Sequence, residues 1–149
     1  MTTFESFSSP STKKFAETLA KKVIARGPKK RGATVLALHG ELGAGKTTFT
    51  QGFMKGLGVR TRVTSPTFIL MRRTALAGKK FKNVFHIDFY RVKRATELKA
   101  LGIMDIFREP SHLVLVEWPE RAPKLIPKGA LRINFHHGEK EHERIIKMQ

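Results

Sequence analysis

The chain has 149 residues, and 29 lysines and arginines against 12 aspartates and glutamates give it a formal net charge of +17. An apolar content of 40% suffices for a folded core, which excludes a disordered basic tail. The lack of cysteine excludes disulfide scaffolds, thiolate zinc sites and cysteine nucleophiles. Because the sequence has neither a secretion signal nor an apolar run of about 18 residues, we expect a cytoplasmic protein without a membrane span.

The first half of the chain reads as helix, strand, glycine-rich loop and helix. Apolar residues recur at helical spacing over residues 15–23, with Ser11 and Thr12 as candidate caps. The apolar run at residues 34–38 (TVLAL) is typical of a buried parallel strand. A second helix is expected at residues 46–57, directly after the glycines.

The second half of the chain is richer in strand patterns. Strands are expected at residues 67–74, 84–90, 113–116, 131–135 and 142–148, and one short helix at residues 96–101. The run at 113–116 (LVLV) is apolar throughout, as in a buried parallel strand, and 142–148 is expected to be an edge strand. This order predicts an α/β fold with a mainly parallel central sheet and antiparallel additions.

The glycine-rich loop carries the strongest chemical signal. Residues 40–47 (GELGAGKT) fit the P-loop pattern G-x-x-x-x-G-K-[ST] at every specified position. Glycines let backbone N–H groups turn toward an anion, and the helix that follows adds its positive end. We expect Lys46 to reach the β and γ phosphates of a nucleotide and Thr47 to bind Mg²⁺. The alternative is a turn that only joins strand to helix.

Two acidic residues are placed to serve hydrolysis. Glu117 ends the strand at 113–116, and the carboxyl ends of parallel strands share the edge of the P-loop. Asp88 lies in an apolar strand, where an acid is costly unless it is paired or linked to a metal. The alternatives are an ordinary exposed glutamate at a strand end, and a structural ion pair of Asp88 with Arg91 or Arg94.

The positive charge is concentrated in residues 60–94, which contain ten lysines and arginines against Asp88 alone. The same block contains Ser65 and Thr67, whose hydroxyls suit a loop that senses the γ-phosphate, although a plain turn is the alternative. We hypothesise a phosphate-contacting surface linked to nucleotide state. The alternative is a solvated basic face or a contact with an acidic protein.

Five segments occur in an order that resembles the TsaE (YjeE) family of bacterial P-loop ATPases: GELGAGKTTF, SPTF, HIDFYR, ELKALGI and LVEWPE, within residues 40–120. The resemblance implies one ATPase domain over residues 1–149, a P-loop NTPase-like three-layer sandwich, with ATP and Mg²⁺ as cofactors. It also implies a part in making threonylcarbamoyladenosine (t6A) in tRNA. In that family the ATPase assists the partners TsaB and TsaD, and its hydrolysis of ATP resets their complex between turnovers.

The same resemblance assigns the site residues. It implies phosphate contacts at Gly43, Ala44, Gly45, Lys46, Thr47 and Thr48, and magnesium held by Thr47, Asp88 and Glu117. Catalysis would fall to Lys46, Asp88 and Glu117, with Glu117 as either a metal ligand or the group that orients water. Ser65 and Thr67 match the switch-like segment, Trp118 would lie near the nucleotide or in the core, and residues 9–12 would contact the adenine.

Two other functions fit parts of the pattern. A small-molecule kinase also pairs a P-loop with basic residues, but it needs a lid and an acceptor pocket, and no arginine-rich lid segment stands apart here. A nucleotide-gated RNA-binding or scaffold protein would bind ATP with negligible turnover. Contact with tRNA through residues 60–94 is compatible with the leading hypothesis and with this last one.

Overall fold

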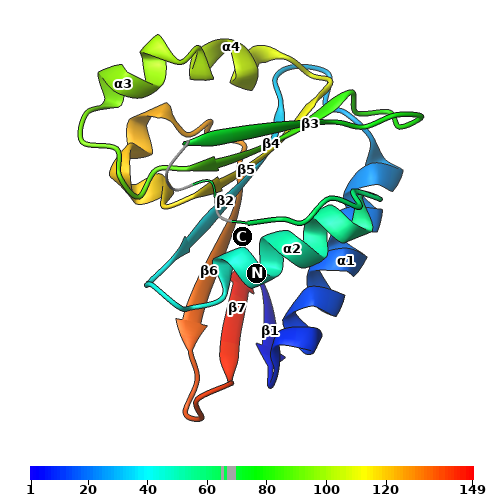
Figure 1. Cartoon of the computed structure of the whole chain (residues 1–149), viewed down its shortest axis with the longest axis vertical. Helices are drawn as coiled ribbons and strands as arrows, with labels where there is room; N and C mark the ends of the chain where they lie inside the picture. Colours follow the sequence, from blue (N-terminus) through cyan, green and yellow to red (C-terminus); the bar gives the residue numbers. More distant parts are fainter. Residues whose placement is uncertain (65, 67–69) are drawn as a thin grey trace.

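The computed structural model describes residues 1–64, 66 and 70–149. Within these residues, seven strands form one sheet in the order β1-β7-β6-β2-β5-β4-β3 (Figure 1). Their bounds are β1 Thr2–Ser6, β2 Thr34–Gly40, β3 Met71–Ala75, β4 Asn83–Asp88, β5 His112–Glu117, β6 Leu131–His137 and β7 Arg144–Met148.

The centre of the sheet is parallel and its flanks are antiparallel, as predicted. Strand β2 runs parallel to both β5 and β6, and β4 runs parallel to β5. The antiparallel pairs β1–β7, β6–β7 and β3–β4 complete the two sides. Strand β5 is buried from Leu113 to Glu117, which explains its continuous apolar run.

Helices cover both faces of the sheet and make the fold a three-layer sandwich (Figure 1). Helices α1 (Ser9–Arg26) and α2 (Lys46–Gly56) pack against each other and share one core with one face of the sheet. Helices α3 (Ala95–Ala100) and α4 (Ile103–Arg108) form a second core with the other face. The short 3-10 turns η1 (Pro119–Arg121) and η2 (Pro123–Leu125) follow β5. None of the helices in the described residues is long and apolar enough to cross a membrane.

Helix α1 begins earlier than predicted. Its N-cap is Ser8, whose hydroxyl accepts a hydrogen bond of 3.2 Å from the backbone N–H of Ser11. The expectation that Ser11 or Thr12 caps this helix is therefore wrong. Thr12 is buried instead, with its hydroxyl 2.7 Å from the hydroxyl of Ser6.

The C-terminal strand is not at the edge of the sheet, contrary to the prediction for residues 142–148. Strand β1 pairs with it on the outer side, with Phe4 opposite Ile146. Strand β1 was not predicted, because Phe4 is its only large apolar residue. Helix α4 was also not predicted. Gly102 was expected only as the residue that stops the helix at 96–101, but it is also the N-cap of α4. Residues 67–69 of the predicted strand 67–74 lie outside the described residues.

Candidate functional site

The loop between β2 and α2 has the backbone that an anion site requires. Gly43 and Gly45 adopt φ values of +73° and +104°, in the left-handed region that glycine tolerates best. Gly45 is the N-cap of α2 and makes no side-chain capping hydrogen bond. The first N–H groups of a helix lack partners within that helix, so the positive end of α2 is available to a bound anion.

Lys46 lies within this loop and is only 5% exposed. Its Nζ donates hydrogen bonds of 2.6 Å to the carbonyl of Gly40 and 2.8 Å to that of Glu41. The same atom lies 4.1 Å from the ring centroid of Trp118, a cation–π contact. Burial lowers the pKa of Lys46, and the nearby carboxylate of Glu117 opposes this effect. The ammonium group is thus held in the loop by backbone oxygens and an aromatic face.

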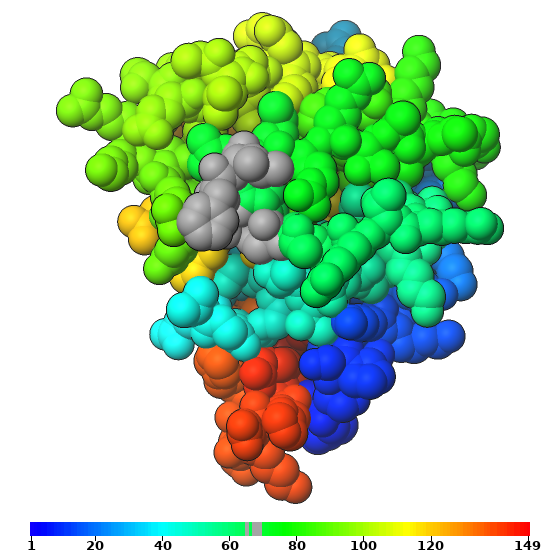
Figure 2. Space-filling view, viewed as in Figure 1, coloured from blue at the N-terminus to red at the C-terminus, as the bar shows by residue number. Residues whose placement is uncertain are grey.

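The predicted acids meet the P-loop in one hollow of about 380 Å³. Asp88 and Glu117 are paired neighbours at the carboxyl ends of β4 and β5. The hollow is lined by Leu42, Gly43, Gly45, Lys46, Thr47, Thr48, Asp88, Tyr90, Glu117 and Trp118. In Figure 2 the P-loop segment, in cyan, reaches the surface above the C-terminal hairpin in orange and red. Strand topology therefore brings together residues that are far apart in the sequence.

Glu117 is buried, with 2% of its surface exposed, so it is not an ordinary surface glutamate. Its Oε1 lies 2.8 Å from Nε2 of His86, a residue for which the sequence suggested no role. The hydroxyl of Thr47 lies 3.3 Å from Oε2 and 3.5 Å from Oε1 of the same carboxylate. The only signal for His86 in the sequence was its position two residues before Asp88, on the same face of β4.

The oxygen donors of this hollow suit magnesium. Asp88 is 2% exposed, and its Oδ1 accepts a 2.8 Å hydrogen bond from the backbone N–H of Tyr90. Together with Thr47 and Glu117 it offers only hard oxygen atoms, the ligand type that Mg²⁺ prefers. Within the described residues, no group of three or more His, Cys, Asp and Glu side chains is arranged to hold a metal by itself. That fits Mg²⁺, which takes one or two carboxylates and leaves other positions to phosphates and water.

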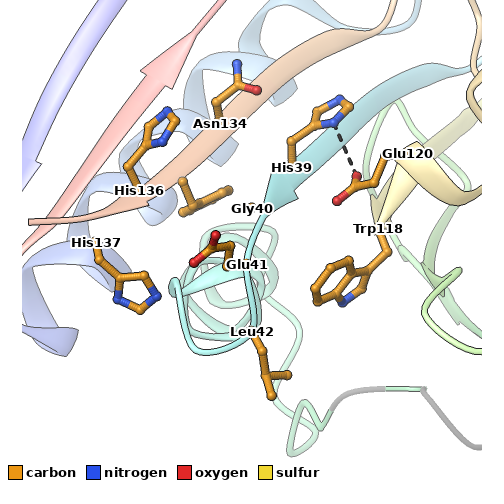
Figure 3. A pocket seen from close by; sticks show the side chains of 10 residues that line it. His39, Gly40, Glu41, Leu42, Trp118, Glu120, Asn134, His136 and His137 are labelled. Carbon is orange, nitrogen blue, oxygen red and sulfur yellow. Dashed lines mark ion pairs between the residues drawn. The ribbon is translucent and has the colours of Figure 1, made fainter.

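A larger hollow of about 680 Å³ adjoins the first one (Figure 3). Leu42 and Trp118 line both hollows, whereas Lys46 and Thr47 line only the smaller one. One wall of the larger hollow carries His39, whose Nδ1 lies 3.3 Å from Oε2 of Glu120. Burial alone would raise the pKa of Glu120, but the hydrogen bond with His39 and nearby charges lower it overall. The predicted phosphate-binding residues Lys46 and Thr47 therefore lie at the smaller hollow.

Trp118 lines both hollows. It has a φ of +58°, unusual for a residue with a side chain, and its ring lies 4.9 Å from that of Tyr90. Trp118 is partly buried and packs against the core beneath α3 and α4, and its ring lies over the Lys46 ammonium group. Core packing is therefore confirmed for Trp118, and its place near a nucleotide stays a prediction.

Arg144 supports the P-loop from β7, a contact that the sequence analysis missed. Its guanidinium donates hydrogen bonds of 3.1 and 3.3 Å to the carbonyl of Gly43. Beside it, Ser9 and Thr12 help to line a small hollow of about 60 Å³ that also reaches Gly43, Gly45 and Thr48. The N-terminal segment thus lies beside the loop, where the predicted adenine contact requires it. The switch candidates Ser65 and Thr67 lie outside the described residues.

Comparison with known proteins identifies the family of the chain. The family model for "Threonylcarbamoyl adenosine biosynthesis protein TsaE" matches residues 7–146. The chain belongs to the TsaE family. A relative in Haemophilus influenzae, named tRNA threonylcarbamoyladenosine biosynthesis protein TsaE, is 37% identical over 125 residues, covering 84% of this chain and 73% of the relative. A TsaE protein of Bacillus subtilis is 38% identical over 99 residues, covering 66% of this chain and 59% of that protein.

The fold is also that of the family. The crystal structure of B. subtilis YdiB superimposes with a TM-score of 0.76 and 28% sequence identity, and the match covers 99% of this chain and 83% of that one. Resemblance to TsaE in sequence motifs is thus matched by resemblance over nearly the whole three-dimensional structure.

Proposed function

We propose that this TsaE-family chain binds and hydrolyses ATP with Mg²⁺, as one P-loop ATPase domain over residues 1–149. One observation carries the proposal: Lys46 and Thr47 face two buried acids, Asp88 and Glu117, across a single hollow. Thr47 and the two acids offer hard oxygen atoms beside the lysine of the P-loop, and Mg²⁺ that is bound to nucleotide phosphates takes such oxygen ligands.

Each residue has a chemical task in this proposal. Backbone N–H groups of residues 43–48 bind the phosphates, and Lys46 exchanges its two carbonyl partners for phosphate oxygens. Magnesium, when bound to Thr47 and the acids, would supply charge to the phosphoryl group as a Lewis acid. Glu117 accepts a proton from the attacking water or orients that water. His86 holds one carboxylate oxygen of Glu117 in place.

The family membership supports a role in the t6A modification of tRNA, because relatives carry names from that pathway. We propose that the chain assists TsaB- and TsaD-like partners and that its ATP hydrolysis resets their complex. A cytoplasmic location follows from a tRNA substrate. Contact with tRNA through residues 60–94 is part of the same proposal. Nine of the ten basic residues of this block, all but Arg91, are exposed and form no ion pair among the described residues.

The decisive experiment measures ATP hydrolysis by the chain alone and with TsaB and TsaD. We expect slow turnover alone, faster turnover with the partners, and in Glu117→Ala a loss of turnover together with weaker Mg²⁺-dependent ATP binding. Lys46→Ala should lose ATP affinity, and Lys140→Ala serves as a control of equal charge change outside the site. If Lys46→Ala binds ATP as tightly as the unmodified chain, the site is wrongly assigned.

A small-molecule kinase remains the second candidate, because the 680 Å³ hollow adjoins the phosphate site and has room for an acceptor. The two functions differ in the fate of the γ-phosphate. Release of inorganic phosphate at the rate of ADP formation supports an ATPase. ADP formation without phosphate release, with label transferred to a small acceptor, supports a kinase.

A further inference from the structure

Two basic segments meet at the end of the sheet opposite the P-loop. One is residues 26–31 (RGPKKR), the last residue of α1 and the loop after it, and the other is residues 79–82 (KKFK), between β3 and β4. Residues 26–31 precede the start of β2 and residues 79–82 precede the start of β4, and these strands are parallel to β5 between them. Figure 1 shows both segments at the same end of the sheet. The phosphate site lies at the carboxyl ends of these strands, roughly 20 Å away along six strand residues.

The two segments are in contact. The side chain of Lys80 lies against Gly27, with its Cδ 3.0 Å from where a Cβ on Gly27 would be. Backbone hydrogen bonds hold the chain at or near both segments: the N–H of Lys82 donates to the carbonyl of Ser111, and the N–H of Ala33, two residues after the first segment, donates to the carbonyl of Phe107. Folding therefore joins two stretches of like charge that are about 50 residues apart in the sequence.

We call the exposed basic side chains of these segments the distal basic cluster: Arg26, Lys29, Lys30, Arg31, Lys79, Lys80 and Lys82. None of them forms an ion pair within the residues that the structure describes. Lys82 also acts on Glu109: the hydrogen bond from Ser111, and more weakly the charge of Lys82, lower the pKa of Glu109. Seven exposed cations on two adjacent segments give this end of the molecule a strong positive field.

The composition of the distal basic cluster favours a phosphate polymer over a protein partner. Protein interfaces are depleted of lysine in their centres and are built around large apolar or aromatic anchors. The exposed large apolar residues of the described chain are Met1, Phe7, Leu42, Tyr90 and Leu101, and none belongs to these two segments. Lysine and arginine at high density without an exposed large apolar side chain among them match a nucleic-acid backbone, which binds through charge and counterion release.

We propose that the distal basic cluster binds the phosphodiester backbone of RNA. The choice of RNA rests on the proposed role in tRNA modification. The surface is distinct from the nucleotide site, and it extends the predicted basic region 60–94 to residues 26–31, which only the fold brings alongside. ATP and RNA then occupy opposite ends of the same parallel strands.

The test is the salt dependence of binding to bulk deacylated tRNA. The triple variant Lys79→Gln/Lys80→Gln/Lys82→Gln removes three charges from the cluster. The matched control Lys13→Gln/Lys14→Gln/Lys140→Gln removes three exposed charges elsewhere. For the full chain, log affinity should fall linearly with log salt. The cluster variant should lose tenfold or more in affinity at low salt, and its slope should be smaller by about 2 to 3. The control should stay within about threefold.

Three results would overturn the proposal. They are a salt-independent affinity of the unmodified chain, an equal loss in the control, and full tRNA affinity in the cluster variant. If that variant keeps tRNA binding but loses binding to the TsaB–TsaD complex, the cluster serves an acidic protein instead. ATP affinity, measured on every variant, separates this proposal from the proposed function. ATP binding without tRNA binding contradicts only the RNA surface, and tRNA binding without ATP binding contradicts only the ATPase.

Discussion

The imidazole of His86 and the carboxylate of Glu117 lie 2.8 Å apart on neighbouring strands, and both side chains are almost fully buried. With Oε1 held by His86, the other oxygen of Glu117 faces the hydroxyl of Thr47 at 3.3 Å. A carboxylate that is fixed by one partner keeps its second oxygen in a single orientation. We therefore assign His86 the task of positioning Glu117.

Substitution of His86 tests this task. His86→Phe keeps a ring in the buried space but removes the hydrogen bond, so Mg²⁺-dependent nucleotide affinity and turnover should fall by about 10- to 100-fold. His86→Gln places an amide N–H near the position of Nε2 and should keep most of the nucleotide affinity and most of the turnover. The fluorescence of Trp118, the only tryptophan, reports binding beside the Lys46 ammonium.

A double-mutant cycle separates positioning from packing. Once Glu117 is alanine, His86→Phe should change Mg²⁺-dependent binding no further, because the oxygen that it positioned is gone. If the two losses simply add, His86 acts on the fold and not through Glu117. Thermal unfolding of each variant shows how much stability the buried pair contributes.

The lowered pKa of Lys46 predicts how stability varies with alkaline pH. Burial holds the pKa of Lys46 in the folded chain below its ordinary value of 10.5, so the unfolded chain binds more protons between the two values. The free energy of unfolding should therefore rise with pH through that window, relative to the Lys46→Met variant. Denaturant titrations of both proteins between pH 8 and about 10.5 measure the difference. A constant difference would mean that the lysine titrates as it does in an unfolded chain.

Arg144 is expected to stabilise the phosphate-binding form of the loop. In Arg144→Gln, the carbonyl of Gly43 loses two charged donors, and ADP affinity should fall roughly fivefold, about 1 kcal/mol. Arg132→Gln is the matched control, because Arg132 is exposed on the neighbouring strand β6 and lines neither hollow of the site. Isothermal titration calorimetry measures both. Equal affinities in the two variants would remove Arg144 from the support of the loop.

The close approach of α1 and α2 depends on Gly52. A Cβ at this position would overlap the backbone of Lys13, and backbone cannot move aside as a flexible side chain can. Gly52→Ala should therefore destabilise the fold by about 2 to 3 kcal/mol, in spite of the better helix propensity of alanine. Lys55→Ala, on the same helix at an exposed position, should cost less than about 0.5 kcal/mol. Chemical denaturation compares the two. A stable Gly52→Ala variant would show that the helices can separate without loss.

Strong local patterns predicted most of the fold, and the weaker elements depend on tertiary contacts. The apolar runs of β2 and β5 and the helical spacing of α1 were sufficient to place those elements. Strand β1 has only Phe4 as a large apolar residue, and it forms because β7 offers a pairing edge. That same pairing places β7 inside the sheet. Helix α4 begins on a glycine at φ +76°, a residue type that in sequence normally signals an end.

Among the site residues, too, some were predictable from local sequence patterns and others depend on tertiary contacts. The P-loop is a contiguous motif, and Glu117 and Asp88 were predictable because parallel strands end at one edge of a sheet. His86 was visible as a neighbour of Asp88 on one strand face, but its partner depends on the register of β4 against β5. Arg144 reaches the loop only through the β6–β7 hairpin, about 100 residues later in the chain, which no local pattern encodes.

Among the residues that the structure describes, no strand pairs with the outer side of β3, whose exposed residues include Arg72 and Arg73. An open edge can pair with the edge of another molecule and start aggregation. When two copies approach at this edge, their arginines come face to face, and the repulsion opposes strand pairing at low ionic strength. This part of the basic block is thus expected to oppose self-association. Neutralising both arginines should make a concentrated solution aggregate sooner, as measured by its turbidity.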